Sequence, residues 1–269
     1  MNKVYSIDAL NKYFNTIRQK NEGLITNFFL NPLKHSLWIE KGELHSVVTD
    51  DCYFIIRKSE LVNHLFFIAT NTRQLANGLK EILPKITFRV MIDIVGNMKV
   101  EPLKQLFLEN GFSEFEIIYR MNRIGFPKYS ALDPHVQYAS IENLDTIYLL
   151  LCKYFNPLSE QIPEKEEIEK LISENKILVY KSDKKIYGFI IFELIGLTLY
   201  LRYWFVAPSF RNLRIGSKLF NSFMYEGRST KRQLFWVIAN NNNAIKRYEH
   251  YGFKVENLFN HVLIREFQQ

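Results

Sequence analysis

A short basic segment in the second half of the chain contains the residue types that bind phosphate groups. It runs from Arg211 to Lys218, includes Arg214 and Gly216, and follows an apolar stretch that ends at Pro208. This order predicts a strand, a tight loop and the start of a helix. Backbone N–H groups at a helix N-terminus lack intrahelical partners and attract anions, and a glycine lets the backbone approach a phosphate. An ordinary strand-to-helix turn with surface charges would show the same features.

A second segment places a tyrosine at helical spacing behind a run of asparagines. Asn241, Ala244 and Tyr248 are followed by Gly252 and Phe253. Ala244 and Tyr248 are four positions apart, so they share one face of a helix. Gly252 suits the left-handed position after a helix end, and Phe253 then packs back on the helix. Taken alone, the pattern also fits a buried tyrosine beside a polar turn.

Together the two segments resemble the two signature motifs of the GNAT acetyltransferase superfamily. Its members usually show an Arg/Gln-x-x-Gly-x-Gly/Ala loop after a Val-x-Pro strand end, which here reads Arg211-x-x-Arg214-x-Gly216. They also show Asn-x-x-Ala followed by Tyr-x-x-x-Gly-Phe, which the second segment matches in order and spacing. The resemblance covers about residues 132–267. The departure is Arg214, where a glycine is usual.

The resemblance implies an acetyl-coenzyme A-dependent N-acetyltransferase in which an amine attacks the thioester directly. Tyr248 is then placed near the leaving sulfur. A phenol with a pKa near ~10 is a reasonable general acid for a thiolate whose thiol has a pKa near ~8.5. The resemblance assigns the pyrophosphate, the pantetheine arm and the carbonyl to the following residues: Trp204, Phe205, Val206, Arg211, Asn212, Leu213, Arg214, Ile215, Gly216, Ser217, Lys218 and Asn241.

The base that takes the proton of the amine is less evident. In related enzymes a glutamate on the central strand often has this role, but residues 197–206 contain no acidic residue. Glu193, on the preceding predicted strand, is the nearest candidate for a catalytic residue. His250 and Tyr200 are further candidates, and water could carry the proton instead.

The order of predicted elements indicates a duplication. In the second half we expect strands at 176–181, 185–194, 197–206, 233–239 and 259–267, with a turn at Ser182–Asp183–Lys184 and helices at 216–226 and 241–251. The first half repeats this order with strands at 36–40, 43–49, 52–57, 64–69, 86–95 and 115–123 and helices at 72–83 and 100–110. Corresponding strand and helix ends lie 138 to 141 residues apart. A constant offset of this kind marks a duplicated unit.

The predicted fold class is therefore α/β (α+β), with two GNAT-like mixed-sheet domains in tandem. We place them at residues 1–126 and 132–269. The first half lacks the phosphate loop, because Ala69–Gly78 contains only Arg73 as a basic residue and no glycine at the helix start. No tyrosine falls in Pro102–Asn110, where a counterpart of Tyr248 would lie. We predict a degenerate first domain and one acetyl-coenzyme A per chain.

Composition narrows the range of partners. The net charge is +7, but it is spread as +3 over residues 1–126 and +4 over residues 127–269, so we expect no nucleic acid. The two cysteines are 100 positions apart, so we expect neither a disulfide framework nor a bound metal. We also predict no signal peptide, no membrane partner and a cytoplasmic location. The expected partner is a small-molecule or peptide amine, and the expected state is a monomer or homodimer.

Two other functions remain open. A non-catalytic acyl-CoA-binding sensor could keep the fold, and Arg214 together with the missing strand carboxylate agrees with that reading. An aminoacyl or peptidoglycan-type transferase of tandem GNAT fold would bind a large tRNA ligand, and the dispersed charge argues against it.

Overall fold

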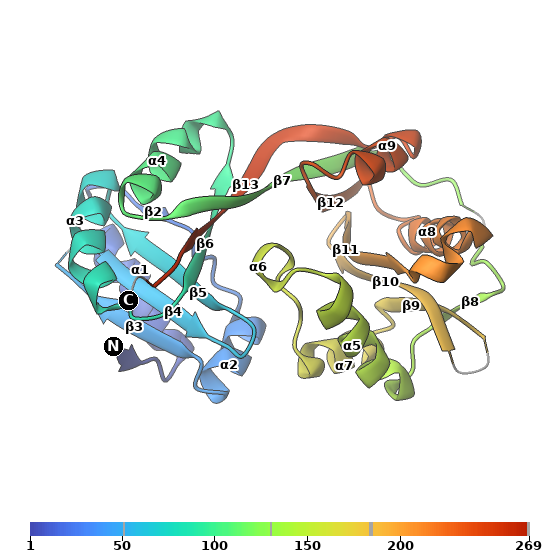
Figure 1. Cartoon of the computed structure of the whole chain (residues 1–269), viewed down its shortest axis with the longest axis horizontal. Helices are drawn as coiled ribbons and strands as arrows, with labels where there is room; N and C mark the ends of the chain where they lie inside the picture. The colour runs from blue at the N-terminus through green and yellow to red at the C-terminus, as the bar shows by residue number, and fades with distance from the viewer. Residues whose placement is uncertain (51, 130, 183–184, 268–269) are drawn as a thin grey trace. The chain divides into compact units, whose positions relative to one another are not determined.

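The computed structural model describes residues 1–50, 52–129, 131–182 and 185–267 (Figure 1). The chain divides into two compact units. Unit 1 comprises Met1–Ile118 and Leu258–Gln269, and unit 2 comprises Tyr119–Asn257. Each unit packs helices on a mixed sheet, which confirms the predicted fold class. Of the predicted turn at 182–184, residues 183 and 184 lie outside the described residues.

Ten of the helices and strands listed below lie wholly in unit 1, and the strands β7 and β13 lie partly in it. Its sheet has the strand order β1-β3-β4-β5-β6-β13. The elements are β1 (Asn2–Lys3), α1 (Ile7–Gln19), β2 (Ile25–Thr26), α2 (Pro32–Glu40), β3 (Leu44–Val48), β4 (Cys52–Lys58), β5 (Asn63–Ala69), α3 (Thr72–Ile82), β6 (Val90–Gly96), α4 (Glu101–Glu109), β7 (Ser113–Ile124) and β13 (Lys254–Arg265).

Unit 2 has the strand order β7-β12-β11-β10-β9-β8. Short 3-10 turns precede α5 and α8, at Ile141–Asn143 and Pro208–Leu213. The other elements are β8 (Val136–Tyr138), α5 (Leu144–Tyr154), α6 (Pro157–Glu160), α7 (Lys165–Ser173), β9 (Ile177–Ser182), β10 (Lys185–Ile195), β11 (Thr198–Val206), α8 (Ile215–Glu226), β12 (Arg232–Ile238) and α9 (Asn242–His250).

The same succession of elements occurs twice. Two helices, three strands, a helix, a strand, a helix and a strand run from α1 to β7, and they recur from α5 to β13. The connection between the first two helices differs, because it forms the short strand β2 in unit 1 and the short helix α6 in unit 2. The duplicated order predicted from the sequence is therefore present in the fold.

One predicted strand is wrong. Residues 36–40 belong to the helix α2, which begins after Asn31. The Asn31 side chain accepts a hydrogen bond from the Lys34 N–H at 3.0 Å, and Pro32 occupies the first turn, where a proline needs no hydrogen-bond partner. Trp38 then packs into the core of unit 1. An N-cap asparagine followed by proline was the sequence signal for this helix.

The two long strands β7 and β13 each contribute residues to both units. β7 leaves unit 1 after Ile118, and β13 enters unit 1 at Leu258. Within unit 1, β13 pairs with β6 from Phe259–Gly96 to Arg265–Val90. The units therefore differ at these strands from the predicted division into residues 1–126 and 132–269. The cause is a pairing between strands far apart in the sequence, which no local pattern records.

Each unit buries apolar side chains on both faces of its sheet. In unit 2, one core lies under α8 and α9 and contains Leu199, Leu219, Phe220, Phe223 and Phe235. The other lies under α5 and α7 and contains Ile147, Leu151, Ile168, Phe189 and Phe205.

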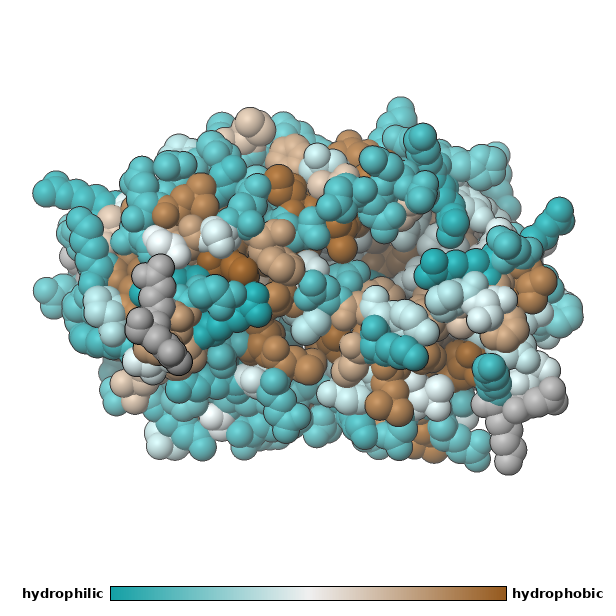
Figure 2. All heavy atoms as spheres, viewed as in Figure 1, coloured by the Kyte–Doolittle hydropathy of each residue, from teal (hydrophilic) through white to brown (hydrophobic). Residues whose placement is uncertain are grey.

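Hydrophilic side chains cover much of the face drawn in Figure 2, with apolar residues between them. Within the described part of the chain, no helix has both the length and the apolar character that a membrane crossing requires.

Candidate functional site

The central strand of unit 2 has one edge that is only partly paired. β10 pairs with β11 along its whole length, from Ile195–Thr198 to Gly188–Val206. On the other edge, the ladder between the described residues of β11 and β12 ends at Tyr200. Beyond that point the parallel strands part, so backbone groups of β11 that face β12 lack ladder partners. A strand edge of this kind can bind an extended ligand through main-chain hydrogen bonds.

A β-bulge changes the direction of the side chains on β11. Tyr203 lies opposite Ile191 and Leu201 lies opposite Phe192, which leaves Arg202 as the extra residue. Because of this insertion, Leu201 belongs to the core under α8, whereas Tyr203 belongs to the core under α5 and α7. The bulge therefore brings the next side chain, Trp204, to the α8 side.

The helix α8 begins without a side-chain cap. Arg214 is its N-cap residue and has a left-handed backbone with φ of 57°, and its side chain makes no capping hydrogen bond. The first intrahelical bond runs from the Lys218 N–H to the Arg214 carbonyl at 3.1 Å. The amides of Ile215, Gly216 and Ser217 precede that bond, and such amides are the ones an anion can accept from.

Arg214 departs from the family pattern at the position where the backbone favours glycine. A left-handed conformation costs an L-residue with a side chain about 1–2 kcal/mol. The arginine adopts this conformation nonetheless. The departure noted in the sequence therefore adds charge and backbone strain to the loop.

Gly216 packs against the end of β11. A Cβ at this position would lie 3.3 Å from Cζ2 of Trp204 and 3.6 Å from Cγ2 of Val206. The missing side chain therefore allows the helix start to lie close to the strand, in addition to any role toward a phosphate.

The basic side chains of the loop point in different directions. Arg211 Nε donates to the Val206 carbonyl at 3.4 Å, a long and easily broken contact. Lys218 Nζ lies 3.2 Å from Nδ1 of His135 and 4.0 Å from Oδ1 of Asp133. Arg211 thus stays at the strand end, whereas Lys218 is directed to the segment before β8. Asn212 and Leu213 are exposed, which suits contact with a ligand.

Tyr248 packs beside the parted strands. Its ring centroid lies 4.0 Å from that of Phe235 and 5.7 Å from that of Trp204. Burial raises the pKa of the Tyr248 phenol well above its ordinary value; Arg247 opposes the rise and Glu160 adds to it. In the part of the chain described, the indole N–H of Trp204 is buried without a hydrogen-bond partner. A ligand that carries an acceptor would satisfy this group.

Asn241 is the N-cap of α9. Its side chain accepts a hydrogen bond from the Ala244 N–H at 3.2 Å. This bond explains the spacing of asparagine and alanine in the motif, because an N-cap side chain reaches the third residue that follows it.

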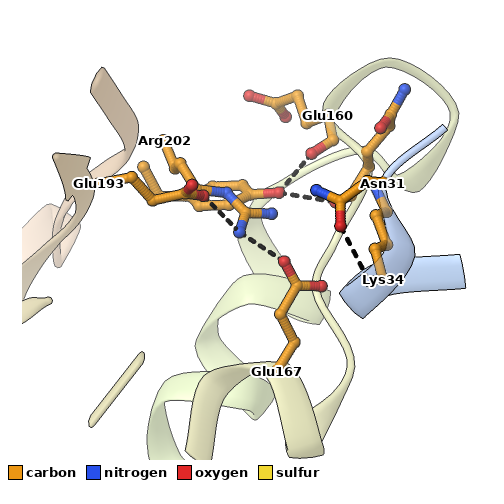
Figure 3. Close-up of polar contacts among 8 residues, drawn as sticks. Asn31, Lys34, Glu160, Glu167, Glu193 and Arg202 are labelled. Carbon is orange, nitrogen blue, oxygen red and sulfur yellow. Dashed lines mark hydrogen bonds and ion pairs between the residues drawn. The ribbon is translucent and has the colours of Figure 1, made fainter. Parts of the chain in front are cut away.

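Glu193 is held by Arg202, as Figure 3 shows. One nitrogen of the guanidinium, Nη1, lies 3.0 Å from Oε1 of Glu193 and 2.5 Å from Oε1 of Glu167 on α7. The neighbouring Tyr203 hydroxyl donates to the backbone carbonyls of Glu160 and Gln161, the latter at 2.9 Å. Arg202 and Tyr203 thus hold residues 156–167, which we call the α6–α7 connection.

Sequence reasoning did not single out Arg202, Tyr203 or Glu167. A signal was present, since Arg202 stands within a strand of apolar and aromatic residues. A charged residue in such a strand requires a partner when it is buried. The identity of the partner comes from other elements and could not be read from the strand.

The equivalent strand edge in unit 1 is filled by the chain itself. β5 pairs with β6 at His64–Met91, and β2 then pairs with β5 at Ile68 and Ala69. Next to β2, the Asn27 side chain bridges the parted strands. Its amide nitrogen donates to the carbonyls of Leu65 and Asp93, each at 3.2 Å, and its oxygen accepts from the Phe67 N–H at 2.8 Å.

The helix start of unit 1 is also closed. The Asn71 side chain caps α3 by accepting from the Gln74 N–H at 3.1 Å. Gly78 lies inside the helix, where a Cβ would come within 2.8 Å of the Phe54 ring. The glycine therefore serves packing, and neither the strand edge nor the helix start of unit 1 resembles an open anion site.

Comparison with known proteins finds one family match, in the second half of the chain. Residues 144–253 match the model of the acetyltransferase (GNAT) family. No curated protein matches the chain.

Several solved structures share the fold. An acetyltransferase of the GNAT family from Colwellia psychrerythraea is 14% identical, with a TM-score of 0.57 over 99% of this chain and 98% of that one. A tandem GNAT protein from the clavulanic acid biosynthesis pathway is 8% identical, with a TM-score of 0.56 over 81% and 80%. A probable N-acyltransferase from Enterococcus faecalis V583 is 10% identical, with a TM-score of 0.60 over 98% and 71%.

The left-handed backbone of Arg214 leads to a stability prediction. Arg214→Gly should raise the free energy of unfolding by up to about 1 kcal/mol, because glycine adopts this conformation without strain. Ser217→Gly is the matched control; it introduces the same residue into the first turn of α8 and should lower the free energy by about 0.5 kcal/mol. Denaturant unfolding measures both. Equal losses in the two variants would show that position 214 carries no strain.

Proposed function

We propose, on the premise that residues 144–253 form a domain of the acetyltransferase (GNAT) family, that this chain is an N-acetyltransferase that uses acetyl-coenzyme A. One observation carries the proposal. The uncapped start of α8 lies against the open edge of β11, and Trp204 contacts both Gly216 and the ring of Tyr248. An anion site beside an unpaired strand edge is what a ligand with a pyrophosphate and an amide-containing arm requires.

The residues present fit such a ligand. The amides of Ile215, Gly216 and Ser217 would hold the pyrophosphate, and Arg211 would add charge after leaving the Val206 carbonyl. The unpaired groups of β11 would bind the pantetheine arm. The buried indole N–H of Trp204 offers a further donor at the same place.

In the proposed reaction the amine nitrogen attacks the carbonyl carbon of the thioester. A C–N bond forms, the C–S bond breaks, and the sulfur leaves with the bonding electron pair. The sulfur takes a proton from the Tyr248 phenol, and the nitrogen loses one proton to a base. Burial raises the pKa of the Tyr248 phenol, which keeps it protonated but makes it a weaker acid toward the thiolate, so the proposed role rests on the position of Tyr248 beside Trp204 and the open strand edge.

The role of Glu193 as the base stays a prediction. Its carboxylate accepts a hydrogen bond from the Arg202 guanidinium, and this contact orients the side chain. A base needs access to the amine as well, and water remains an alternative carrier of the proton.

The rival function, a non-catalytic acyl-CoA-binding sensor, needs the same cofactor site and no proton donor. Tyr248 distinguishes the two, since its half-buried phenol lies beside the open strand edge. A tandem aminoacyl or peptidoglycan-type transferase would bind RNA phosphates, and the acidic connection described next does not favour such a ligand.

We propose that residues 156–167 line the acceptor side of the site, and these residues are acidic. Residues 156–167 contain four glutamates and one lysine. The lysine, Lys165, pairs with Asp145 at 2.6 Å. Through Tyr203 and Arg202 this connection is fastened to the bulge of β11. Its charge favours an acceptor that carries ammonium groups over one that carries a carboxylate.

Tyr248→Phe tests the proton donor. Turnover should fall by roughly 10²–10⁴-fold, whereas the Kd for acetyl-coenzyme A should stay within about threefold, because the hydroxyl acts in the chemical step. Tyr251→Phe removes a hydroxyl from a ring that packs on Phe220 and should leave turnover unchanged. Calorimetry and single-turnover kinetics provide the measurements. Full single-turnover activity in Tyr248→Phe would eliminate Tyr248 as the acid.

Binding stoichiometry tests the assignment of the cofactor to unit 2. Titration should give one acetyl-coenzyme A per chain, because Asn27 and Asn71 close the corresponding features of unit 1. The double variant Arg211→Ala with Gly216→Val should weaken binding by at least about tenfold, since it removes a cation and presses on Trp204. Asn71→Ala is the control in unit 1 and should bind normally. Two equivalents bound per chain would contradict the assignment.

Matched pairs of amines test the acceptor side. Cadaverine should react with a kcat/KM at least about tenfold above that of lysine, and agmatine should exceed arginine likewise, because each second member adds only a carboxylate. A thiol-release assay measures both members at several salt concentrations, and the preference should decline as salt screens the charges. A preference for the amino acids would show that the acidic connection does not face the acceptor.

A further inference from the structure

Arg202 occupies an unusual place in the central strand. It is the extra residue of the bulge in β11, and its side chain is only 13% exposed. The strand around it is otherwise uncharged, with the sequence Thr-Leu-Tyr-Leu-Arg-Tyr-Trp-Phe-Val. A guanidinium in such surroundings is costly unless carboxylates compensate it.

Two carboxylates from different elements compensate Arg202. Glu193 extends from β10 and Glu167 from α7, and both accept from Nη1 (Figure 3). The contact with Glu193 joins the bulge to the neighbouring strand β10, and the contact with Glu167 joins it to the helix α7. Glu193 is paired across the sheet with Tyr200, just before the bulge. The guanidinium therefore connects the bulge to the strand pair that precedes it and to the helix α7.

The bulge decides which side chains face the proposed cofactor. Without the extra residue, every later side chain of β11 would point to the opposite face of the sheet. Trp204 would leave Tyr248 and Gly216, and Tyr203 would lose its hydrogen bonds to the α6–α7 connection. The extra residue in β11 thus determines the position of Trp204 on the cofactor side and of Tyr203 on the acceptor side of the proposed site.

We propose that Arg202 is a positioning residue, and this rests on the proposed acetyl transfer. Its ion pairs with Glu167 and Glu193 hold the bulge in register and keep the α6–α7 connection against it. The guanidinium acts through Trp204, Tyr203 and the connection, without contact to the reacting atoms. Because the same bulge directs Trp204 toward Gly216 and Tyr248, breaking the ion pairs should also weaken cofactor binding.

The test compares Arg202→Met, Arg202→Lys and Glu167→Gln. In Arg202→Met we expect kcat to fall at least about tenfold, and both the KM for the amine and the Kd for acetyl-coenzyme A to rise. Arg202→Lys should recover part of kcat, because one ion pair survives. Glu167→Gln keeps the pair with Glu193, so it provides a milder variant should Arg202→Met fold poorly.

Hydrogen exchange supplies a readout that does not depend on activity. Amides in residues 156–167 and 198–206 should exchange faster in Arg202→Met than in the unaltered chain. Arg89→Met is the control, because Arg89 pairs with Glu266 in unit 1, and it should leave both segments and kcat unchanged.

The outcomes separate the two proposals. A folded Arg202→Met variant with normal kcat, or with unchanged exchange in both segments, would overturn the positioning role. A chain that binds acetyl-coenzyme A and acetylates no amine would instead overturn the proposed function. In that case faster exchange in Arg202→Met would still support the hold of Arg202 on the bulge.

Discussion

The parting of β11 from β12 is the constraint on which the rest of unit 2 depends. Two parallel strands that separate after Tyr200 leave main-chain donors and acceptors without partners. Such groups need water, a ligand or another segment of the chain, because an unpaired buried backbone group is costly. The uncapped start of α8, the indole of Trp204 and the phenol of Tyr248 all lie at this opening. The proposed site for an extended anionic ligand depends on that one irregularity in the sheet.

The two units meet the same constraint in opposite ways. In unit 1, β2 and the Asn27 side chain bind the open edge of β5, and Asn71 caps the helix that follows. In unit 2, the corresponding connection forms α6, which the Tyr203 hydroxyl holds through backbone carbonyls. A duplicated fold can thus become a closed scaffold through a few hydrogen bonds made by its own chain. Unit 1 keeps its apolar core, because β2, Asn27 and Asn71 fill only the strand edge and the helix start.

Charge is distributed in unit 2 according to the side of β11. The segment from Arg211 to Lys218 contains three basic residues and no acidic one, whereas residues 156–167 contain four glutamates and one lysine. Opposite charges on the two faces of a sheet suit an anionic donor on one side and a cationic acceptor on the other. Arg202 lies on the strand between them, and the carboxylates of Glu167 and Glu193 compensate its positive charge.

The sequence by itself determined the features that depend on spacing within one element. The basic loop before α8, the cap of α9 by Asn241 and the order of strands and helices in the second half all follow from residues a few positions apart. Turn and cap chemistry is local, so these patterns carry their own explanation. The same local logic was missed at Asn31, where a cap and a proline begin a helix that we expected to be a strand.

Only the tertiary structure decided the features that join distant elements. The bulge at Arg202, the pairing of β13 with β6 and the filling of unit 1 by Asn27 each need partners tens to hundreds of residues away. A bulge interrupts the alternation of side chains at a single residue, so it gives no periodic pattern in the sequence. The choice of strand partner depends on hydrogen bonding and packing between distant segments. The sequence therefore indicated which groups could do chemistry, and the packing of the sheet determined which of them meet.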